Sequence, residues 1–385
     1  MTEKLYYMDS HLHEFSAVVT ACREVAGGWQ IALDRTAFFP EGGGQGADTG
    51  SIGPARVTDV QETDGEIWHA ADRPLPVGET VDCALDWEPR RRRMQNHTGE
   101  HIVSGLVHGL YGFDNVGFHM GAECMTMDYS GELSRQQLDT VERLANEAVR
   151  DDLPLRIWFP EAAELAALVY RSKLELTENV RIVEIPGVDR CACCAPHVDR
   201  TGEVGVIKLL SAERHRGGTR VTALCGMDAL EDYRRRQEAV VAVSQLLSVP
   251  RDQVAPAVER LLGEQARQKE RIAALSMELV RLRAAATVET EGNLCVFDTV
   301  LDEIAQRELA NLLSARCGGA AAVFSGSDGQ GWRYIIGSRR VDLRANARAI
   351  NAAIGGKGGG SREMIQGRAT ASAAEIQAYW DTVHF

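Results

Sequence analysis

Two pairs of metal-ligand residues, far apart in the sequence, constrain the fold of this chain more than any other feature. The first pair is His97 and His101, in the stretch Asn96-His97-Thr98-Gly99-Glu100-His101. On a helix, residues four apart lie on one face, one turn from each other. The second pair is Cys193 and His197. Three imidazoles and one thiolate suit a tetrahedral zinc ion, so the pattern predicts a fold that joins both segments around one Zn²⁺ per chain.

The residues around each pair indicate the local backbone. Apolar residues recur at helical spacing over residues 88–111, Pro89 suits a first helical turn, and Gly112 ends the pattern. Pro196 disfavours the helical conformation at the residue before it, so we expect Cys193 and His197 to approach the metal from a turn. Cys191 and Cys194 remain alternative candidates for the fourth ligand.

Two other interpretations of this motif stay open. Four protein ligands are typical of structural zinc, whereas catalytic zinc usually keeps one position for water. An RNA-binding protein with a structural zinc is therefore one alternative. His97-Thr98-Gly99-Glu100-His101 also matches the H-x-x-E-H pattern of inverted zinc peptidases, in which Glu100 would be the general base.

The order of the segments predicts an α+β multidomain protein with four parts. Residues 1–87 contain short apolar runs between glycine and proline turns, which predicts a small β-barrel interrupted by the glycine-rich loop around residues 40–46. Residues 88–226 hold both ligand pairs and predict an α/β zinc-containing domain. Residues 227–290 predict a long helical connector, and residues 291–385 a C-terminal α/β domain with a Gly-rich loop.

The connector carries a heptad pattern formed by Val258, Leu261, Gln265, Gln268, Ile272, Leu275, Leu279 and Leu282. This pattern is typical of a coiled coil, and it favours a homodimer through the connector or the C-terminal domain. An amphipathic helix packed on its own domain explains the pattern equally well. In the C-terminal part, Gly355–Gly360 predicts a loop whose successive N–H groups cradle an anion, with Lys357 adding positive charge.

Composition limits the classes of function. The net charge of −13 over 385 residues argues against a general nucleic-acid binder, although a local basic surface is enough for RNA. The first residues lack a signal-peptide pattern, and no apolar run approaches the roughly 20 residues of a membrane helix. Nine cysteines, three of them at Cys191, Cys193 and Cys194, fit a reducing compartment and a metal role. We therefore expect a cytoplasmic protein.

At this point the motifs resemble a known family. Thr36-Ala37-Phe38-Phe39-Pro40-Glu41-Gly42-Gly43-Gly44-Gln45, then the two ligand pairs, then Thr201-Gly202-Glu203 resemble the editing region of alanyl-tRNA synthetases, and still more the free-standing alanyl-tRNA editing proteins of the AlaX type, long form. The glycines of residues 355–360 resemble a motif of the DHH-associated C-terminal domain. In this chain Cys194-Ala195-Pro196 replaces the more usual Gly-Gly-Thr between the ligands. No aminoacylation domain is found ahead of the barrel, so the resemblance implies an editor that acts in trans.

The resemblance implies a zinc-dependent hydrolase that maintains translation fidelity. Its partner would be tRNA(Ala) mischarged with serine, or with glycine, and it would cleave the aminoacyl ester. Glu100, Thr36 and Gln45 are the candidate catalytic residues, with Thr36 proposed to distinguish serine from alanine. Gly43 and Gly44 are candidates for binding the substrate. Candidate tRNA contacts in the C-terminal domain are Lys357, Arg362, Arg339 and Arg340.

Overall fold

The computed structural model describes residues 1–172 and 180–385. The chain divides into two compact units, Met1–Val240 (unit 1) and Val241–Phe385 (unit 2). Each unit has its own hydrophobic clusters, so each is described separately. The structure is a mixture of helices and sheets, as the sequence predicts. The division into four domains stays a prediction.

Six antiparallel strands of unit 1 close into a barrel in the order β2-β3-β7-β6-β5-β8. Alternate residues of these strands, among them Ile31, Val57 and Ile67, are fully buried in its interior. The strands are β2 (Glu14–Val25), β3 (Gly28–Leu33), β5 (Gly50–Ile52), β6 (Ala55–Thr63), β7 (Glu66–Ala71) and β8 (Thr80–Leu85). Beside the barrel, β1 (Glu3–Lys4) pairs in parallel with β4 (Arg35–Thr36). The short helix η1 (Leu5–Tyr7) follows β1 directly.

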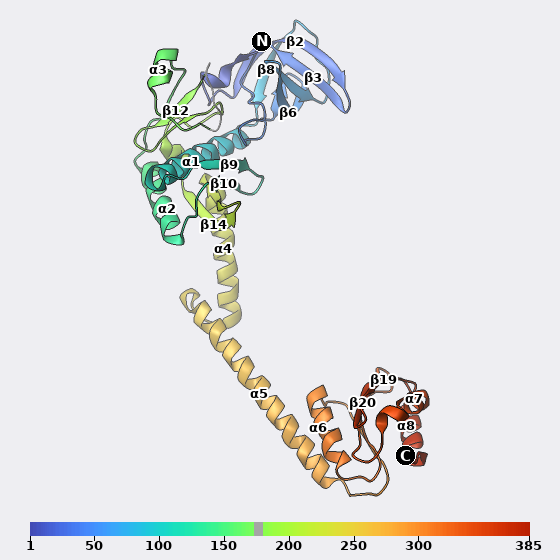
Figure 1. Ribbon diagram of the computed structural model, residues 1–385. Coiled ribbons are helices and arrows are strands. Elements are labelled where there is room, and N and C mark those ends of the chain that lie inside the picture. Colours follow the sequence, from blue (N-terminus) through green and yellow to red (C-terminus); the bar gives the residue numbers. More distant parts are fainter. Residues whose placement is uncertain (173–179) are drawn as a thin grey trace. The chain divides into compact units, whose positions relative to one another are not determined.

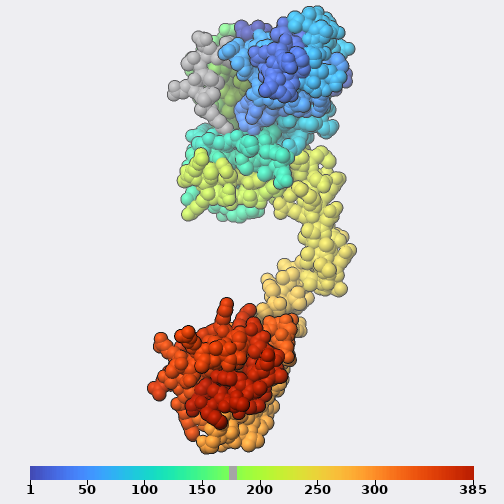
Figure 2. All heavy atoms as spheres, turned by 90° about the vertical axis from the view of Figure 1, so that its right-hand side faces the viewer, coloured from blue at the N-terminus to red at the C-terminus, as the bar shows by residue number. Residues whose placement is uncertain are grey.

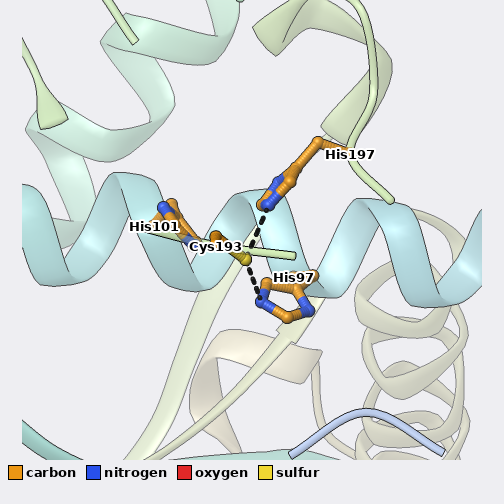
Figure 3. Close-up of side chains that lie close together, drawn as sticks. All are labelled: His97, His101, Cys193 and His197. Atoms are coloured by element: carbon orange, nitrogen blue, oxygen red, sulfur yellow. Dashed lines mark hydrogen bonds between the residues drawn. The ribbon is translucent and has the colours of Figure 1, made fainter. Parts of the chain in front are cut away.

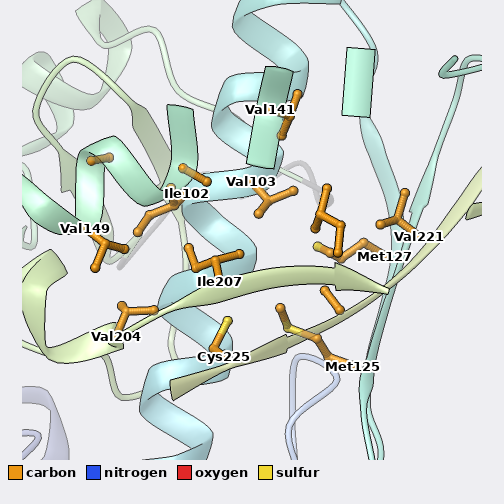
Figure 4. Packing of buried hydrophobic residues seen from close by; sticks show 14 of the residues in the cluster. Ile102, Val103, Met125, Met127, Val141, Val149, Val204, Ile207, Val221 and Cys225 are labelled. Atoms are coloured by element: carbon orange, nitrogen blue, oxygen red, sulfur yellow. The ribbon is translucent and has the colours of Figure 1, made fainter. Parts of the chain in front are cut away.

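Helix α1 (Trp87–Tyr111) lies between the barrel and a four-stranded antiparallel sheet of order β14-β15-β10-β9 (Figure 1). The predicted helix over residues 88–111 is confirmed, and it ends at Gly112 in the left-handed conformation (φ 69°). Apolar side chains from α1, α2 and the sheet form one core (Figure 4). The elements are α2 (Arg135–Arg150), β9 (Asn115–Met120), β10 (Met125–Tyr129), β14 (Ile207–His215) and β15 (Gly218–Cys225).

A small three-stranded sheet completes unit 1 and leads into the second ligand pair. Its strands are β11 (Arg156–Trp158), β12 (Ile182–Ile185) and β13 (Asp189–Ala192), with α3 (Ala162–Ala167) after β11 and η2 (Thr201–Val204) beyond the ligands. Residues 193–199 follow β13 without regular structure, as Pro196 predicts. The barrel packs directly on the rest of unit 1 (Figure 2), and Ala195 belongs to the barrel's core cluster.

The predicted connector consists of two helices, because Pro250 interrupts the helical run. These helices are α4 (Gly226–Leu247) and α5 (Val254–Ala286), with the short η3 (Arg251–Gln253) between them. The apolar positions of the heptad pattern on α5 are solvent-exposed, from 37% at Val258 to 63% at Leu282. Within the described parts of the chain, no helix is both long and apolar enough to cross a membrane.

Unit 2 is built on a five-stranded sheet of order β16-β17-β18-β20-β19, in which only β16 and β17 are parallel. Two hydrophobic clusters cover its two faces, one with α5 and α6 and the other with α7 and α8. The elements are β16 (Leu294–Asp298), α6 (Glu303–Ser314), β17 (Ala321–Ser327), β18 (Gly331–Gly337), α7 (Leu343–Ala353), β19 (Gly356–Gly360), β20 (Met364–Ala369) and α8 (Ala373–Thr382).

The predicted glycine-rich loop of the C-terminal domain is wrong. Gly356–Gly360 is an extended edge strand, β19, paired with β20, and only Gly355 has a left-handed backbone (φ 59°). A nest of successive N–H groups requires alternating turn conformations, which an extended strand does not provide. The glycines are needed for close approach instead, since a Cβ at Gly358 would lie 2.4 Å from Oη of Tyr334.

Candidate metal centre

The two predicted ligand pairs meet in the interior of unit 1. Helix α1 presents His97 and His101 on one face, and the segment after β13 brings Cys193 and His197 against them. The candidate ligand atoms of all four residues lie within 4.8 Å of one another. Sγ of Cys193 lies 3.5 Å from Nε2 of His97 and 3.3 Å from Nε2 of His197 (Figure 3). One ion can therefore be reached by all four side chains.

The second nitrogen of each imidazole is engaged away from Cys193. Nδ1 of His97 donates to Oε1 of Gln45 at 2.9 Å, and Nδ1 of His101 donates to Asp189 at 3.0 Å. Nδ1 of His197 lies 3.0 Å from Oγ1 of Thr98. Partners of this kind fix the tautomer of a metal-binding histidine and leave Nε2 for the ion. The donor set thus fits a borderline-soft divalent metal such as zinc.

Electrostatics in the cluster favour a thiolate at Cys193. Burial opposes its ionisation, but the electrostatic effect of His97 and hydrogen bonds from His101 and His197 lower the pKa of the thiol well below its usual value. Burial lowers the pKa of His197 to about 3, so this imidazole is neutral, as a metal ligand must be. The buried guanidinium of Arg181 donates to the backbone oxygens of Cys193 and Ala195, which holds the loop in shape. Cys191 and Cys194 lie outside the set of four.

Glu100 faces the cluster from α1. Its Oε1 accepts hydrogen bonds from Ser104 and from Asn115 of β9, each at 2.6 Å. Oε2 lies 3.7 Å from Nε2 of His101, and the side chain is nearly buried. One carboxylate oxygen is therefore fixed by the protein, while the other lies beside Nε2 of His101, the ring nitrogen that Asp189 leaves free.

The glycine-rich loop of the barrel reaches the cluster through Gln45. Gly42 and Gln45 close a tight turn by two backbone hydrogen bonds of 3.0 Å, and Gly43 and Gly44 adopt positive φ within it. A Cβ at Gly44 would lie 2.5 Å from the backbone oxygen of Phe118, so the loop fits against β9 only with glycine there. Gln45 is buried, and its Nε2 has no hydrogen-bond partner among the described residues.

Thr36 and the basic residues of the C-terminal part are not in this cluster. The hydroxyl of Thr36 is buried near the barrel, where it pairs with Nε2 of His69 at 2.9 Å and accepts from the N–H of Phe38. In unit 2, Lys357 is exposed on β19 opposite Arg368. The exposed side chains of Arg339, Arg340 and Arg362 lie at the strand ends near the turn between β19 and β20.

Sequence reasoning missed the residues that orient the ligands. Thr98 and Asp189 are next to or near the ligands in sequence, but nothing in their spacing indicates a bond to a particular imidazole. Asn115 and Ser104, which hold Glu100, belong to no motif. Nor does the sequence show that Nε2 of Gln45 lacks a hydrogen-bond partner among the described residues, because this depends on how the loop packs.

Comparison with known proteins places this geometry in a family. The "Threonyl and Alanyl tRNA synthetase second additional domain" matches residues 180–221, which include Cys193 and His197, and "tRNA synthetases class II (A)" matches residues 4–89. The alanyl-tRNA editing protein AlaX-L of Pyrococcus horikoshii is 30% identical over 98% of this chain and 96% of its own length. The chain belongs to the alanyl-tRNA editing protein family. The family resemblance predicted from the motifs is thereby confirmed.

Alanine–tRNA ligases are similar to this alanyl-tRNA editing family member over part of their length. Those of Natronomonas pharaonis and Halorubrum lacusprofundi are 34% and 32% identical over 90% and 95% of this chain. The chain spans only 39% and 42% of these two ligases. Among solved structures, the C-Ala domain of the Aquifex aeolicus alanyl-tRNA synthetase matches 25% of the chain and 96% of that domain, with 20% identity and a TM-score of 0.22.

Proposed function

We propose that the protein is a trans-editing hydrolase that deacylates mischarged tRNA(Ala), chiefly Ser-tRNA(Ala) and also Gly-tRNA(Ala). The observation that carries this proposal is the buried set of three histidines and one cysteine in a chain that matches AlaX-L over nearly its whole length. The inverted zinc-peptidase alternative has less support, because such sites usually take a carboxylate as third ligand. Here Cys193 and His197 complete the group around His97 and His101, and no carboxylate is among its four members.

One Zn²⁺ per chain is the metal that this donor set favours, with His97, His101, Cys193 and His197 as ligands. Zinc supplies a Lewis acid that polarises an ester carbonyl or lowers the pKa of a bound water. Four protein donors already satisfy tetrahedral coordination. We therefore assign the proton transfer and the binding of the substrate oxygen to side chains beside the ion.

Glu100 is our candidate for the proton acceptor. Ser104 and Asn115 hold Oε1, which leaves Oε2 directed toward the cluster. In the proposed reaction Oε2 takes a proton from water as the water oxygen bonds to the ester carbonyl carbon. The bond between that carbon and the terminal ribose oxygen then breaks. Glu100 returns the proton to this oxygen, and the products are the free amino acid and tRNA.

Gln45 is our candidate for the group that binds the substrate. Its Oε1 is occupied by His97, whereas the N–H groups of its Nε2 are buried and have no partner among the described residues. A buried donor without a partner is costly, and a ligand oxygen would satisfy it. We propose that Nε2 donates to the carbonyl oxygen of the ester, where negative charge develops during attack. The backbone of Gly43 and Gly44 would line the same cleft.

Discrimination against alanine requires a group that recognises the serine hydroxyl. Pockets that only sense one added atom discriminate by about 1–3 kcal/mol, whereas hydrogen bonding to a hydroxyl discriminates far more strongly. Thr36 remains our candidate. Because its own proton goes to His69, its oxygen can act toward a ligand only as an acceptor. Such an oxygen would accept the O–H of serine, a donor that alanine lacks.

The tRNA would also contact unit 2 through Lys357, Arg339, Arg340 and Arg362, all of them exposed. We further propose a homodimer through α5, because six of its eight heptad positions are apolar and these six are uncovered in the described chain. Flanking charges suit this pairing, since Glu264 and Lys269 occupy positions that meet in a parallel coiled coil. Sedimentation at several concentrations tests it, and a monomer at all concentrations would exclude it.

Incubation of the purified protein with Ser-tRNA(Ala), Gly-tRNA(Ala) and Ala-tRNA(Ala) tests the proposed activity. We expect release of serine and of glycine, while Ala-tRNA(Ala) is spared. Cys193→Ala should lose both zinc and deacylation. Cys194→Ala is the matched control, because the neighbouring thiol lies outside the set of four, and it should retain both. Intact Ser-tRNA(Ala) after incubation, or full zinc content in Cys193→Ala, would overturn the assignment.

A further inference from the structure

A fully buried ion pair joins α1 to the glycine-rich loop of the barrel. Arg90 is 0% exposed and Asp48 is 1% exposed. Nε and Nη2 of Arg90 donate to Oδ2 of Asp48 at 3.0 and 2.6 Å, and its remaining donors reach the backbone oxygens of Ser10 and Ala37. Burial raises the pKa of Asp48 and lowers that of Arg90. Each side chain is therefore stabilised in its charged form by the opposite charge of the other.

Asp48 closes the base of the loop as well as binding Arg90. Its Oδ2 accepts the N–H of Phe39 at 2.7 Å, and its own N–H donates to the carbonyl of Phe39 at 3.0 Å. These bonds join the two ends of the segment from Pro40 to Ala47, which contains Gln45. Arg93, one turn further along α1, adds a second contact to Asp48 at 3.4 Å. The loop is therefore anchored to the helix at its base.

The same helix face meets the same loop a second time at the metal cluster. His97 lies seven residues after Arg90, which is about two helical turns, or roughly 10 Å, along the same face. Gln45 lies three residues before Asp48, and its Oε1 accepts from Nδ1 of His97. Two contacts thus align the loop with α1: the ion pair at the base and the Gln45–His97 bond at the tip.

We propose that Arg90 and Asp48 are positioning residues, whose ion pair holds the loop in the register that brings Gln45 to His97. The role of Gln45 toward the substrate rests on the proposed function. The alignment of the loop with α1 does not, because it follows from the contacts within the fold. A hydrophobic contact at this place would hold the loop as firmly, yet it would not select one register, because apolar packing is not directional. A guanidinium with four bonds in fixed directions does select one.

A double-mutant cycle separates this role from ordinary stabilisation. Removing one partner would leave a buried charge without its counter-charge, whereas removing both charges of a buried pair is often tolerated. The test variant is therefore Arg90→Met combined with Asp48→Asn, in which the amide oxygen can still accept from Phe39. The control is Arg283→Met combined with Asp298→Asn in unit 2. Asp298 likewise is buried, pairs with arginine and accepts backbone N–H groups.

Zinc affinity, measured by competition with a chelating dye, is the readout. Gln45→Ala should weaken zinc binding about tenfold or more in the native chain, as expected for losing the partner of a metal-bound imidazole. In the Arg90→Met/Asp48→Asn chain, Gln45→Ala should have almost no further effect, since the bond is already lost. In the Arg283→Met/Asp298→Asn chain the tenfold effect should persist. An equal effect of Gln45→Ala in all three chains would overturn the proposal.

Hydrogen exchange of metal-free protein gives an independent result. The amides of Gly42 and Gln45, which close the turn, should exchange at least tenfold faster after Arg90→Met/Asp48→Asn and unchanged in the control. Unchanged exchange in both double variants would refute the proposal that the Arg90–Asp48 ion pair holds the loop. If the test variant does not fold, Arg90→Lys replaces it, because lysine keeps the charge and loses the fixed fork. A chain that binds no zinc, or that binds zinc and cleaves no ester, would refute the proposed function and leave this result valid.

Discussion

At the candidate metal centre, three different segments hold the three imidazoles. Gln45 comes from the barrel loop, Asp189 from β13, and Thr98 from α1 itself. The direction of each Nε2 atom is thereby set before any ion binds, so little side-chain freedom remains to be lost on binding. Of these partners, Thr98 gives the cleanest test, because a valine of similar shape removes only its hydrogen bonding.

We predict that Thr98→Val lowers the affinity for zinc by about tenfold, the lower end of the range for lost partners of metal-bound histidines. The hydroxyl of Thr98 bonds Nδ1 of His197 and also accepts from the N–H of Val198, so both the ring and its loop lose a support. Thr98→Ser keeps the hydroxyl and is the control. Titration with a zinc-binding dye measures both. Equal affinity in the native protein and Thr98→Val would contradict the prediction.

The buried His69 makes the stability of unit 1 depend on pH. Burial lowers its pKa to about 4 in the folded chain, compared with 6.5 in the unfolded chain. Between these values the unfolded state binds the proton first, so stability is complete above pH 6.5 and falls as the pH drops toward 4. The full difference amounts to about 3 kcal/mol. We predict that His69→Gln makes this part of the profile, measured by urea unfolding, less steep; His197, whose pKa is also lowered by burial, accounts for part of the slope that remains. His108→Gln, at an exposed histidine, should leave it unchanged.

At the scale of elements, α1 is unusual because the structure buries it on nearly all sides around the ligands. Two of its glycines allow this burial. A Cβ at Gly105 would lie 2.5 Å from the backbone oxygen of Val188 and 2.6 Å from Cβ of Asp189, just before the second ligand pair. A Cβ at Gly99 would lie 2.3 Å from Sγ of Cys225. Gly109, on the same helix, is exposed, and a Cβ added there would meet no atom of the described residues within 4 Å.

We predict opposite effects of two identical substitutions in this helix. Gly105→Ala should destabilise the protein by about 1–3 kcal/mol, because backbone atoms of the next segment must move to admit the methyl group. Gly109→Ala should stabilise it by up to about 1 kcal/mol through helix propensity alone. Urea unfolding measures both. If Gly105→Ala also stabilises, the close approach between α1 and residues 188–189 is refuted.

The elements that sequence reasoning predicted well are those set by local patterns. The helix over residues 88–111 follows from apolar spacing and from Gly112. The four predicted ligand residues do come together, and their role as metal ligands stays a prediction. The strand at Gly356–Gly360 could not be predicted, since five residues without β-propensity are extended only because β20 and Tyr334 lie close by. The Gln45–His97 bond likewise depends on how the barrel docks on α1. Local sequence does not specify contacts of this kind.

At the scale of the whole molecule, the candidate reaction residues and the proposed tRNA contacts lie in different units of the chain. All candidate ligands, Glu100 and Gln45 lie in unit 1, whereas the exposed cations proposed to contact tRNA lie in unit 2. Lys357 shares the α6-side face of the sheet with Arg368, because cross-strand partners point to the same side. Helix α7 covers the other face, so a cation on α7 such as Arg348 is a matched control for Lys357.

We predict that residues 1–240 alone retain zinc and bind tRNA(Ala) more weakly than the full chain, with a shallower dependence of affinity on salt. Each phosphate contact that is lost should reduce the slope of log K against log salt concentration by about one. In the full chain, Lys357→Glu should reproduce part of this loss, while Arg348→Glu should not. Filter binding at several salt concentrations measures all four proteins. Identical slopes for the full chain and for residues 1–240 would show that unit 2 makes no phosphate contacts, and recognition of tRNA would then belong to unit 1.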